Sequence, residues 1–283
     1  MRLFEDSGLC LEENDKFFID ARAKKDQDIV ITHAHSDHAK TTTQNRYFMT
    51  KGTSSLLKKG KKSEINEIPF RKKFSLGEFS VSLHNSGHIL GSSQLKVEGN
   101  KTVVFTSDFK LQDSILFKGA EIIPSDILVI ESTFGAPQHF FPEREIVYAE
   151  MKKWLKEKLK ENKFIVLGGY STGKAQELTR LVNEFLGEAP FVHGKIAEQN
   201  SAYEENGVKL GKYLKLNNNL REGNVLIMPP HLIGPSLLAA LAHEAGRKVE
   251  CAVATGWNGR GYKTFPLSDH ADFNQLMHYV EKS

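Results

Sequence analysis

One short stretch of the sequence concentrates side chains that bind metal ions. It reads His33-Ala-His35-Ser-Asp37-His38 and follows directly after the apolar run DIVIT. Each buried imidazole or carboxylate needs its own hydrogen-bond partner, so this cluster suits a metal site far better than a core. Residues two apart in an extended loop point the same way, which places His33 and His35 to share one ion. Asp37 and His38 begin the next turn and face a second position.

Three further segments supply companion residues. His88 lies in NSGHILGSS, where glycines allow close backbone approach, and Asp108 ends the run TVVFTSD, where N-capping of a helix is its alternative role. His270 lies in LSDHADF, so the C-terminal segment must fold back if this residue is a ligand. The chain has only two cysteines, which leaves imidazole and carboxylate ligands and favours zinc. The seven candidate ligands suit two ions with Asp108 as a bridge, and they are His33, His35, Asp37, His38, His88, Asp108 and His270.

The elements that must position these residues change in kind along the chain. Short apolar runs between residues 8 and 32, and again at 79–83, 101–108 and 126–133, are typical of strands. The second half alternates strands with helices: the sequence predicts helices over 143–161, 174–186 and 236–246, and strands over 164–168, 224–230 and 248–256. In the first of these helices Ile146, Met151, Trp154, Leu155 and Leu159 are expected close to one face. This pattern indicates an α/β protein, with a second unit that begins near residue 145.

Composition and charge exclude several classes of protein. The 283 residues carry 38 Lys and Arg against 35 Asp and Glu, and 40% are hydrophobic, as in a folded soluble chain. Prolines interrupt the most apolar run, Leu226–Ala242, so no membrane span is expected. The N-terminus carries acids where a signal peptide needs an apolar stretch, and two cysteines cannot form a disulfide framework. We therefore expect a cytoplasmic protein.

Five motifs in chain order resemble those of the metallo-β-lactamase-fold hydrolases, and within them the nucleases with a β-CASP domain. These motifs are HAHSDH, SGHILGS, SDF, ESTFG at 131–135 and SDHAD. GKAQEL, VHG and GWNGRG look most like the short exonucleases associated with DNA ligases, and nucleases that process RNA 3′ ends are near neighbours. The resemblance implies an αββα metallo-β-lactamase sandwich formed by residues 1–145 and 263–283. A shortened β-CASP-like domain would be inserted at residues 146–262.

The resemblance also implies roles for individual residues. His33, His35 and His88 would hold one Zn²⁺, Asp37, His38 and His270 a second, and Asp108 would bridge them, with Mn²⁺ as a possible substitute. Glu131 would orient the proton donor, so the implied catalytic residues are Asp37, Asp108 and Glu131. Asp20 matches a structural aspartate that hydrogen-bonds the metal-binding loop. Larger family members carry a further histidine, often regarded as the general acid, and the sequence does not place it. Arg260 is a candidate for that role.

The implied function is hydrolysis of phosphodiester bonds in nucleic acid by a metal-dependent enzyme. The expected activity is that of an exonuclease on single-stranded DNA in DNA repair, with a DNA ligase or a helicase as possible partners. An RNA 3′-end processing or RNA-degrading nuclease is the alternative. A thioesterase-like hydrolase of small molecules is the second alternative, although such an enzyme should lack ESTFG and the inserted domain.

Two basic features are candidates for binding the substrate. Gly168–Lys174 matches the first seven positions of a phosphate-binding P-loop, but Ala175 lacks the hydroxyl that would hold magnesium, which disfavours an ATPase. Ser171, Thr172 and Lys174 could grip a nucleic-acid phosphate, as could Arg260, or the segment could be a tight turn with a solvated lysine. Residues 51–73 hold eight Lys and Arg against two Glu, which could attract a polyanion or form a solvated face.

Overall fold

The computed structural model describes residues 2–5, 8–22, 25–42, 44–57, 64–216, 219–257 and 261–283. These residues form two compact units, and each unit combines segments that are distant in the sequence. Unit 1 comprises residues 1–111, 119–140 and 270–283, and unit 2 comprises residues 112–118 and 141–269. In the described ranges, no helix has both the length and the apolar character needed to cross a membrane.

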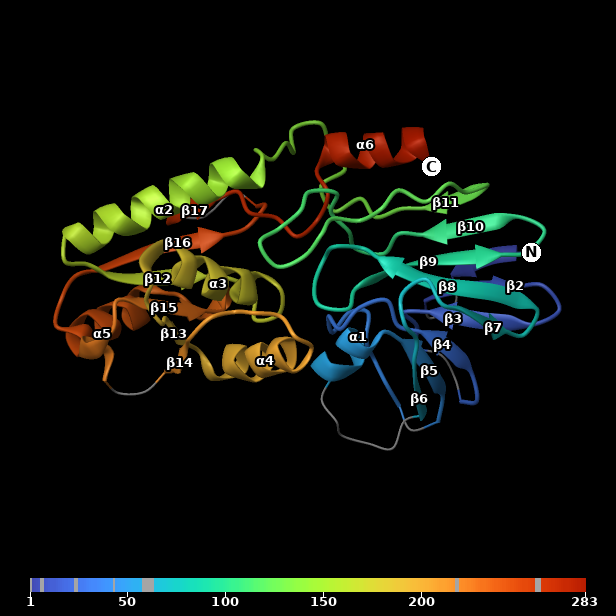
Figure 1. Cartoon of the computed structure of the whole chain (residues 1–283), viewed down its shortest axis with the longest axis horizontal. Coiled ribbons are helices and arrows are strands. Elements are labelled where there is room, and N and C mark those ends of the chain that lie inside the picture. The colour runs from blue at the N-terminus through green and yellow to red at the C-terminus, as the bar shows by residue number, and fades with distance from the viewer. Residues whose placement is uncertain are drawn as a thin grey trace. The chain divides into compact units, whose positions relative to one another are not determined.

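Unit 1 contains two sheets (Figure 1). The strands of the first sheet lie in chain order: β1 (Arg2–Glu5), β2 (Leu9–Glu12), β3 (Lys16–Ile19), β4 (Asp28–Val30), β5 (Arg46–Met49) and β6 (Glu64–Glu67). The second sheet has the order β11 (Ile127–Val129), β10 (Thr102–Phe105), β9 (Ser93–Glu98), β8 (Phe79–Asn85) and β7 (Lys73–Leu76). Strands β3 to β6 pair in parallel, and so do β10 and β11, whereas the other pairs are antiparallel.

The two sheets of unit 1 share a hydrophobic core because side chains alternate along each strand. Leu11 and Val30 of the first sheet belong to the same buried cluster as Val81 and Leu95 of the second. The neighbouring strand residues Cys10, Phe18 and Ile29 are also buried, in a separate cluster on the other face of the first sheet. Both faces of this sheet are therefore apolar and covered by other parts of unit 1.

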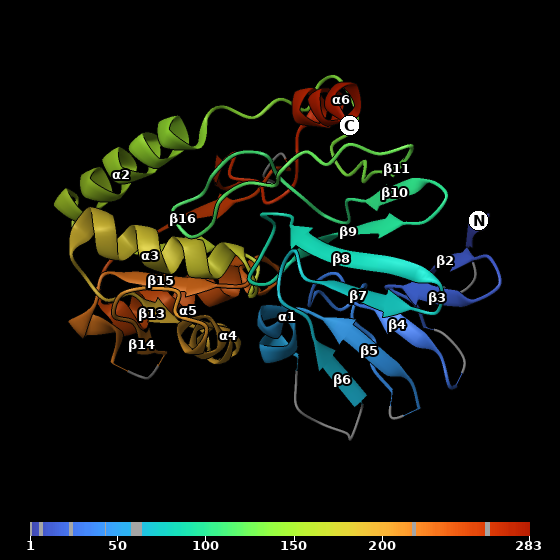
Figure 2. The same cartoon turned by 45° about the vertical axis from the view of Figure 1, so that its right-hand side comes forward.

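Two helices complete the described part of unit 1. Helix α1 (Lys51–Leu56) begins after Thr50, whose side chain accepts a hydrogen bond from the Thr53 amide. Helix α6 (Phe273–Lys282) is capped in the same way by Asp272 and packs with the second sheet in both views (Figures 1 and 2). Leu276 and Tyr279 of α6 are buried in that contact. The C-terminal segment therefore returns to unit 1.

Unit 2 is built on one parallel sheet with helices on both faces. Its strand order is β14 (Leu214–Lys215), β13 (Phe191–Val192), β15 (Val225–Met228), β12 (Phe164–Gly168), β16 (Val249–Ala254) and β17 (Lys263–Phe265). The helices are α2 (Arg144–Lys160), α3 (Lys174–Leu186), α4 (Gly194–Glu205) and α5 (Pro235–Ala245), with short 3₁₀ turns η1 (Leu220–Glu222) and η2 (Pro230–Leu232). Parallel strands require such crossover connections.

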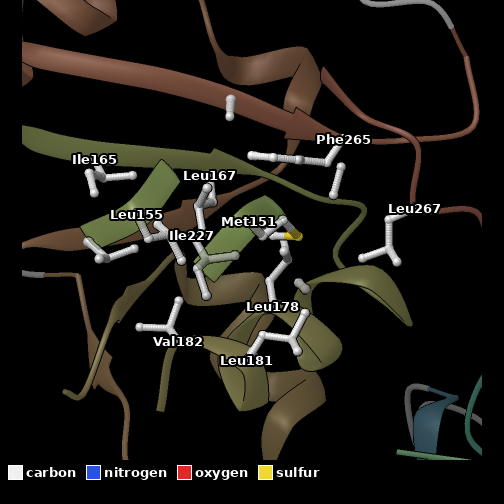
Figure 3. Close-up of a cluster of buried hydrophobic side chains, with 14 of the residues drawn as sticks. Met151, Leu155, Ile165, Leu167, Leu178, Leu181, Val182, Ile227, Phe265 and Leu267 are labelled. Atoms are coloured by element: carbon white, nitrogen blue, oxygen red, sulfur yellow. The ribbon is translucent and has the colours of Figure 1, made fainter. Parts of the chain in front are cut away.

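Alternation along β12 divides the core of unit 2 between the two faces of the sheet. Ile165 and Leu167 pack with α2 and α3, as Figure 3 shows. Phe164 and Val166 lie in a second cluster with residues of α5. A parallel strand that is covered on both faces has a continuous run of apolar residues. This is why the sequence FIVLG of β12 can be recognised as a strand.

The predicted α/β class is confirmed, and three details differ from the sequence-based expectation. Ile146 was expected on the buried face of α2 but is 53% exposed, because the buried residues of this helix are spaced by four from Val147. The C-terminal strand β17, expected in the first domain, pairs in parallel with β16 of unit 2. Helix α4 is not predicted by the sequence pattern. The division of domains at residues 145 and 262 stays a prediction.

Helix α2 offers a direct test of this packing. Leu155 is fully buried and Ile146 is exposed on the same helix. We expect Leu155→Ala to lower the free energy of unfolding by about 2–5 kcal/mol, because the truncation removes buried apolar surface and leaves a cavity. Ile146→Ala, the matched control, should change it by about 0.5 kcal/mol or less. Urea unfolding followed by circular dichroism measures both variants, and equal losses would contradict the packing of α2.

Candidate metal centre

The predicted metal ligands all lie in unit 1, where loops that follow strands carry them. His33, His35, Asp37 and His38 follow β4, and His88 lies in the turn between β8 and β9. Asp108 follows β10, Glu131 follows β11, and His270 precedes α6. Because β10 and β11 are parallel neighbours, their carboxyl ends bring Asp108 and Glu131 to the same edge of the sheet.

Three histidines surround one carboxylate oxygen of Asp108. A ligand atom from each of His33, His35, His88 and Asp108 lies within 4.8 Å of the others. Asp108 Oδ2 is 3.4 Å from His33 Nε2 and 3.6 Å from His88 Nε2. His88 Nε2 is in turn 3.1 Å from His35 Nδ1. Four such atoms converging on one point form a donor set of the kind that zinc takes.

His38 and His270 also approach this aspartate, and Asp37 approaches His38. His38 Nε2 is 3.7 Å from Asp108 Oδ2 and 3.8 Å from Asp37 Oδ2. His270 forms a second group of convergent ligand atoms with Asp108 and Glu131. The Asp37 side chain is 78% exposed, in contrast to the fully buried His33. Asp108 is therefore a common neighbour of His33, His88, His38 and His270, and Asp37 is exposed.

Two carboxylates fix the orientation of two of these imidazoles. Asp20 Oδ2 is 2.7 Å from His38 Nδ1, and Glu131 Oε2 is 2.9 Å from His270 Nδ1. An ionised carboxylate only accepts hydrogen bonds, so Nδ1 must carry the proton in both histidines. In the neutral form of each imidazole the lone pair is then on Nε2, the atom that would bind a metal ion.

His33 provides the test of whether this site suits a metal ion. Its Nε2 atom is buried and has no hydrogen-bond partner among the described residues, although Asp108 lies 3.4 Å away. A buried nitrogen without a hydrogen bond is costly unless another interaction replaces the lost water. A metal ion at this position would satisfy the nitrogen, so the donor set and the orphaned atom both fit a metal centre.

The charges of the centre differ from those of the same groups in water. Burial, together with the nearby His88, His38 and His35, holds the pKa of His33 well below 6.5. His33 is therefore neutral at pH 7, as a metal ligand must be. Burial also raises the pKa of Asp108 to about 6, against the opposing charge of His270. For His38, burial works against the charged form, but its hydrogen bond and ion pair with Asp20 prevail and raise the pKa to about 9.

Several known proteins have sequences related to this chain. A probable DNA ligase from Opitutus terrae is 30% identical over 265 residues, which cover 89% of this chain and 25% of the ligase. The transcription termination factor FttA from a Lokiarchaeum species is 33% identical over 140 residues, 46% of this chain and 22% of FttA. A probable RNase from Methanocaldococcus jannaschii is 35% identical over 119 residues, 40% of this chain and 27% of that protein. The chain thus spans about a quarter of the length of these relatives.

These relatives, together with the ligand geometry, confirm the family that the motifs suggest. The chain belongs to the β-CASP branch of the metallo-β-lactamase fold. A search against models of protein families gives no match. A crystal structure of an Enterococcus faecalis protein of unknown function has the same fold, with a TM-score of 0.63 at 12% identity, and the match covers 92% of this chain and 75% of that one.

The P-loop-like turn of this β-CASP protein lies in unit 2, and its groups are already paired. Lys174 is 2% exposed, and its Nζ atom lies 2.9 Å from Asp269 Oδ1 and 3.4 Å from Glu177 Oε2. The Gly173 amide donates to the Gln176 side chain, and the Ala175 amide donates to the Tyr170 carbonyl. A buried, neutralised lysine and occupied amides disfavour the predicted phosphate contact at Lys174, which stays a prediction.

The other predicted substrate contacts are less fully described. Thr172 donates a hydrogen bond to Gln199 Oε1 at 3.3 Å, and Ser171 is partly exposed. Arg260 lies outside the described residues, and so do Lys58, Lys59, Lys61 and Lys62 of the basic stretch. Among the described basic residues of that stretch, Arg71 pairs with Glu121 and Lys73 pairs with Glu98. A role of these residues in binding a polyanion also stays a prediction.

Three residues near the ligands were not expected from the sequence. Thr32 and Ser107 are buried and contact His33 Nδ1 through their hydroxyl groups, at 3.2 Å and 3.4 Å. Lys110 is 2% exposed, and its ammonium group donates to the carbonyls of Gly87 and His88. All three residues stand within two positions of a predicted ligand, and Ser107 also lies in the SDF motif, but the sequence does not show which atoms they contact.

The Asp20–His38 pair predicts how the metal-free protein responds to pH. Because the pKa of His38 is raised from 6.5 to about 9, its charged form stabilises the fold fully below pH 6.5. That contribution disappears as the pH rises through about 9. We expect the free energy of unfolding of EDTA-treated protein to fall by about 1–3 kcal/mol across this window.

Asp20→Asn should remove most of this pH dependence because the variant lacks the charge that raises the pKa of His38. Asp28→Asn is the matched control, since Asp28 pairs with Arg46 and with none of the histidines of the centre. Urea titrations at several pH values measure the slope. An unchanged slope in Asp20→Asn, or an equal loss in Asp28→Asn, would contradict the assignment.

Proposed function

We propose that this chain is a dinuclear zinc nuclease that hydrolyses phosphodiester bonds in nucleic acid. The observation that carries the proposal is the position of Asp108. Its Oδ2 atom lies 3.4 Å from His33 Nε2, 3.6 Å from His88 Nε2 and 3.7 Å from His38 Nε2, and Asp108 also groups with His270. A carboxylate in that position is suited to bridge two ions.

The proposed ligands divide into two sets around Asp108. His33, His35 and His88 would hold one ion, Asp37, His38 and His270 would hold the other, and Mn²⁺ is a possible substitute. When bound, the ions supply Lewis acidity, which makes hydroxide available near neutral pH and offsets negative charge on the phosphate oxygens.

The residues of the chain itself hold and orient this chemistry. Glu131 accepts hydrogen bonds from the Phe109 amide at 2.7 Å and, at 2.9 Å, from His270, so it links the segment after Asp108 to the C-terminal ligand. Asp20 orients His38 in the same manner. The burial of His33 and His88 excludes water from one side of the centre, and the exposed Asp37 marks the side from which substrate would approach.

Nucleic acid is the proposed substrate class because of the relatives. One is named a probable RNase and another a probable DNA ligase, and the latter match extends over 89% of this chain. These names favour a nucleic-acid substrate over a small-molecule thioester. The longer match, to a probable DNA ligase, favours DNA as the polymer and a DNA ligase as partner of the proposed exonuclease. The shorter match supports the alternative, an RNA-processing nuclease.

End-labelled single strands of DNA and RNA with the same sequence test the proposal. We expect the zinc-loaded chain to shorten the DNA progressively, and Asp108→Asn to lower kcat by about a thousandfold because the variant lacks the bridging charge. Glu131→Gln should lower kcat by about 10- to 100-fold through loss of orientation at His270.

Glu121→Gln is the matched control for Glu131→Gln. Glu121 also holds a histidine of unit 1, with Oε1 at 2.7 Å from His84 Nδ1, but His84 is not one of the proposed ligands. This variant should keep kcat within about twofold of wild type. Progressive cleavage of RNA alone would select the RNA alternative. A zinc-loaded chain that cleaves neither strand, or an Asp108→Asn variant with full activity, would overturn the proposal.

A further inference from the structure

His33 lacks the carboxylate partner at Nδ1 that His38 and His270 possess. The Nδ1 atoms of His38 and His270 face Asp20 and Glu131 directly. The Nδ1 atom of His33 instead faces two hydroxyl groups, those of Thr32 and Ser107. The orientation of His33 therefore depends on how these hydroxyls share their hydrogens.

The carboxylate of Asp20 sets the direction of the hydrogen bonds that join it to Thr32 and Ser107. Thr32 Oγ1 is 2.6 Å from Asp20 Oδ2, and the carboxylate can only accept, so the Thr32 hydroxyl donates to Asp20. Thr32 Oγ1 is also 2.6 Å from Ser107 Oγ. Because the Thr32 hydrogen is already used, the Ser107 hydroxyl must donate to Thr32.

Both hydroxyl oxygens then present lone pairs to His33. Nδ1 lies 3.2 Å from Thr32 Oγ1 and 3.4 Å from Ser107 Oγ, so its proton is shared between the two acceptors. The lone pair of the ring is left on Nε2, the buried atom that faces Asp108 and has no hydrogen-bond partner in the described ranges. Asp20 thus sets the tautomer of His33 through Thr32 and Ser107, as well as that of His38 directly.

The backbone of Ser107 shows that this serine is in an unfavourable conformation. Its φ angle is +52°, in the left-handed region that glycine adopts without strain and serine does not. Ser107 is 4% exposed, so solvent does not explain a polar side chain at this position. Asp20, the acceptor at the end of the same chain of hydrogen bonds, also has a positive φ of +49°. Strain that collects in one hydrogen-bonded network is typical of a functional site.

We propose that Ser107 is a positioning residue of the metal centre and is present for its hydroxyl group. The hydroxyl completes the pair of acceptors that holds His33 Nδ1 and directs Nε2 toward Asp108. Glycine would suit the backbone at this position better but would leave Thr32 as the sole hydroxyl acceptor for His33 Nδ1. The inference rests on the proposed metal centre and is independent of which polymer the chain cleaves.

Two substitutions separate the hydroxyl from the backbone strain. Ser107→Ala removes the hydroxyl and keeps the strain, whereas Ser107→Gly removes both. We expect each variant to bind zinc about 10- to 100-fold more weakly than wild type, as competition with a chromophoric chelator measures it. Metal-free Ser107→Gly should nevertheless unfold at a higher urea concentration than Ser107→Ala, because glycine relieves the strain. The visible absorption of the Co²⁺-substituted protein should change in both variants, since the orientation of His33 changes.

Ser82→Ala is the matched control. Ser82 is also 4% exposed and lies in unit 1, and its hydroxyl contacts a histidine nitrogen, His84 Nε2, at 3.0 Å. Because His84 is not a proposed ligand, the zinc affinity of Ser82→Ala should stay within about twofold of wild type. The spectrum of the Co²⁺-substituted Ser82→Ala protein should not shift.

The outcomes distinguish this inference from the proposed metal centre. If wild type binds zinc and Ser107→Gly binds it equally well, the role of Ser107 is overturned and the metal centre stands. The role of Ser107 is also overturned if zinc affinity follows the stability of the variants, so that Ser107→Gly binds zinc more tightly than Ser107→Ala. If wild type itself binds no zinc, the proposed centre is overturned together with this inference.

Discussion

The candidate centre depends on a simple property of carboxylates: in the ionised form they accept hydrogen bonds and cannot donate them. Asp20 and Glu131 each accept a hydrogen bond from the Nδ1 atom of a histidine, so the neutral forms of His38 and His270 have their lone pairs on Nε2. Through Thr32, Asp20 exerts the same control on His33. Without these acceptors the imidazoles could rotate or exchange protons, and their nitrogens would no longer converge on Asp108.

The sandwich of unit 1 explains how acceptors from distant parts of the sequence reach the ligands. Parallel pairing of β10 with β11 brings Glu131 beside the segment that follows Asp108, where it accepts from the Phe109 amide. The same phenylalanine offers its carbonyl to the Ala271 amide, at 2.6 Å, which ties the C-terminal segment to this edge. Buried contacts of Phe109 with Tyr279 of α6 reinforce the connection. Packing of the second sheet against α6 therefore positions His270.

The sequence indicates the candidate ligands more clearly than the residues that surround them, for a physical reason. His33, His35 and His38 crowd into one loop, and that density of polar groups has no good explanation except a metal site. Thr32 and Ser107 are ordinary residues in the sequence, because their importance lies in hydrogen bonds between segments more than seventy residues apart. Strand alternation and apolar runs likewise predict the sheets, since local burial sets their period. No sequence pattern shows that a single side chain is buried by a partner far away in the chain. Lys174 is an example, because its partner Asp269 lies 95 residues further along.

The metal content of the purified chain tests the central claim most directly. Elemental analysis of zinc-loaded protein after removal of free metal should find about two ions per chain, because the seven proposed ligands are enough for two ions that share Asp108. Asp108→Ala, which lacks the shared ligand, should retain markedly less zinc at both positions. A wild-type chain that retains no zinc, or an Asp108→Ala variant that retains as much as wild type, would contradict the account.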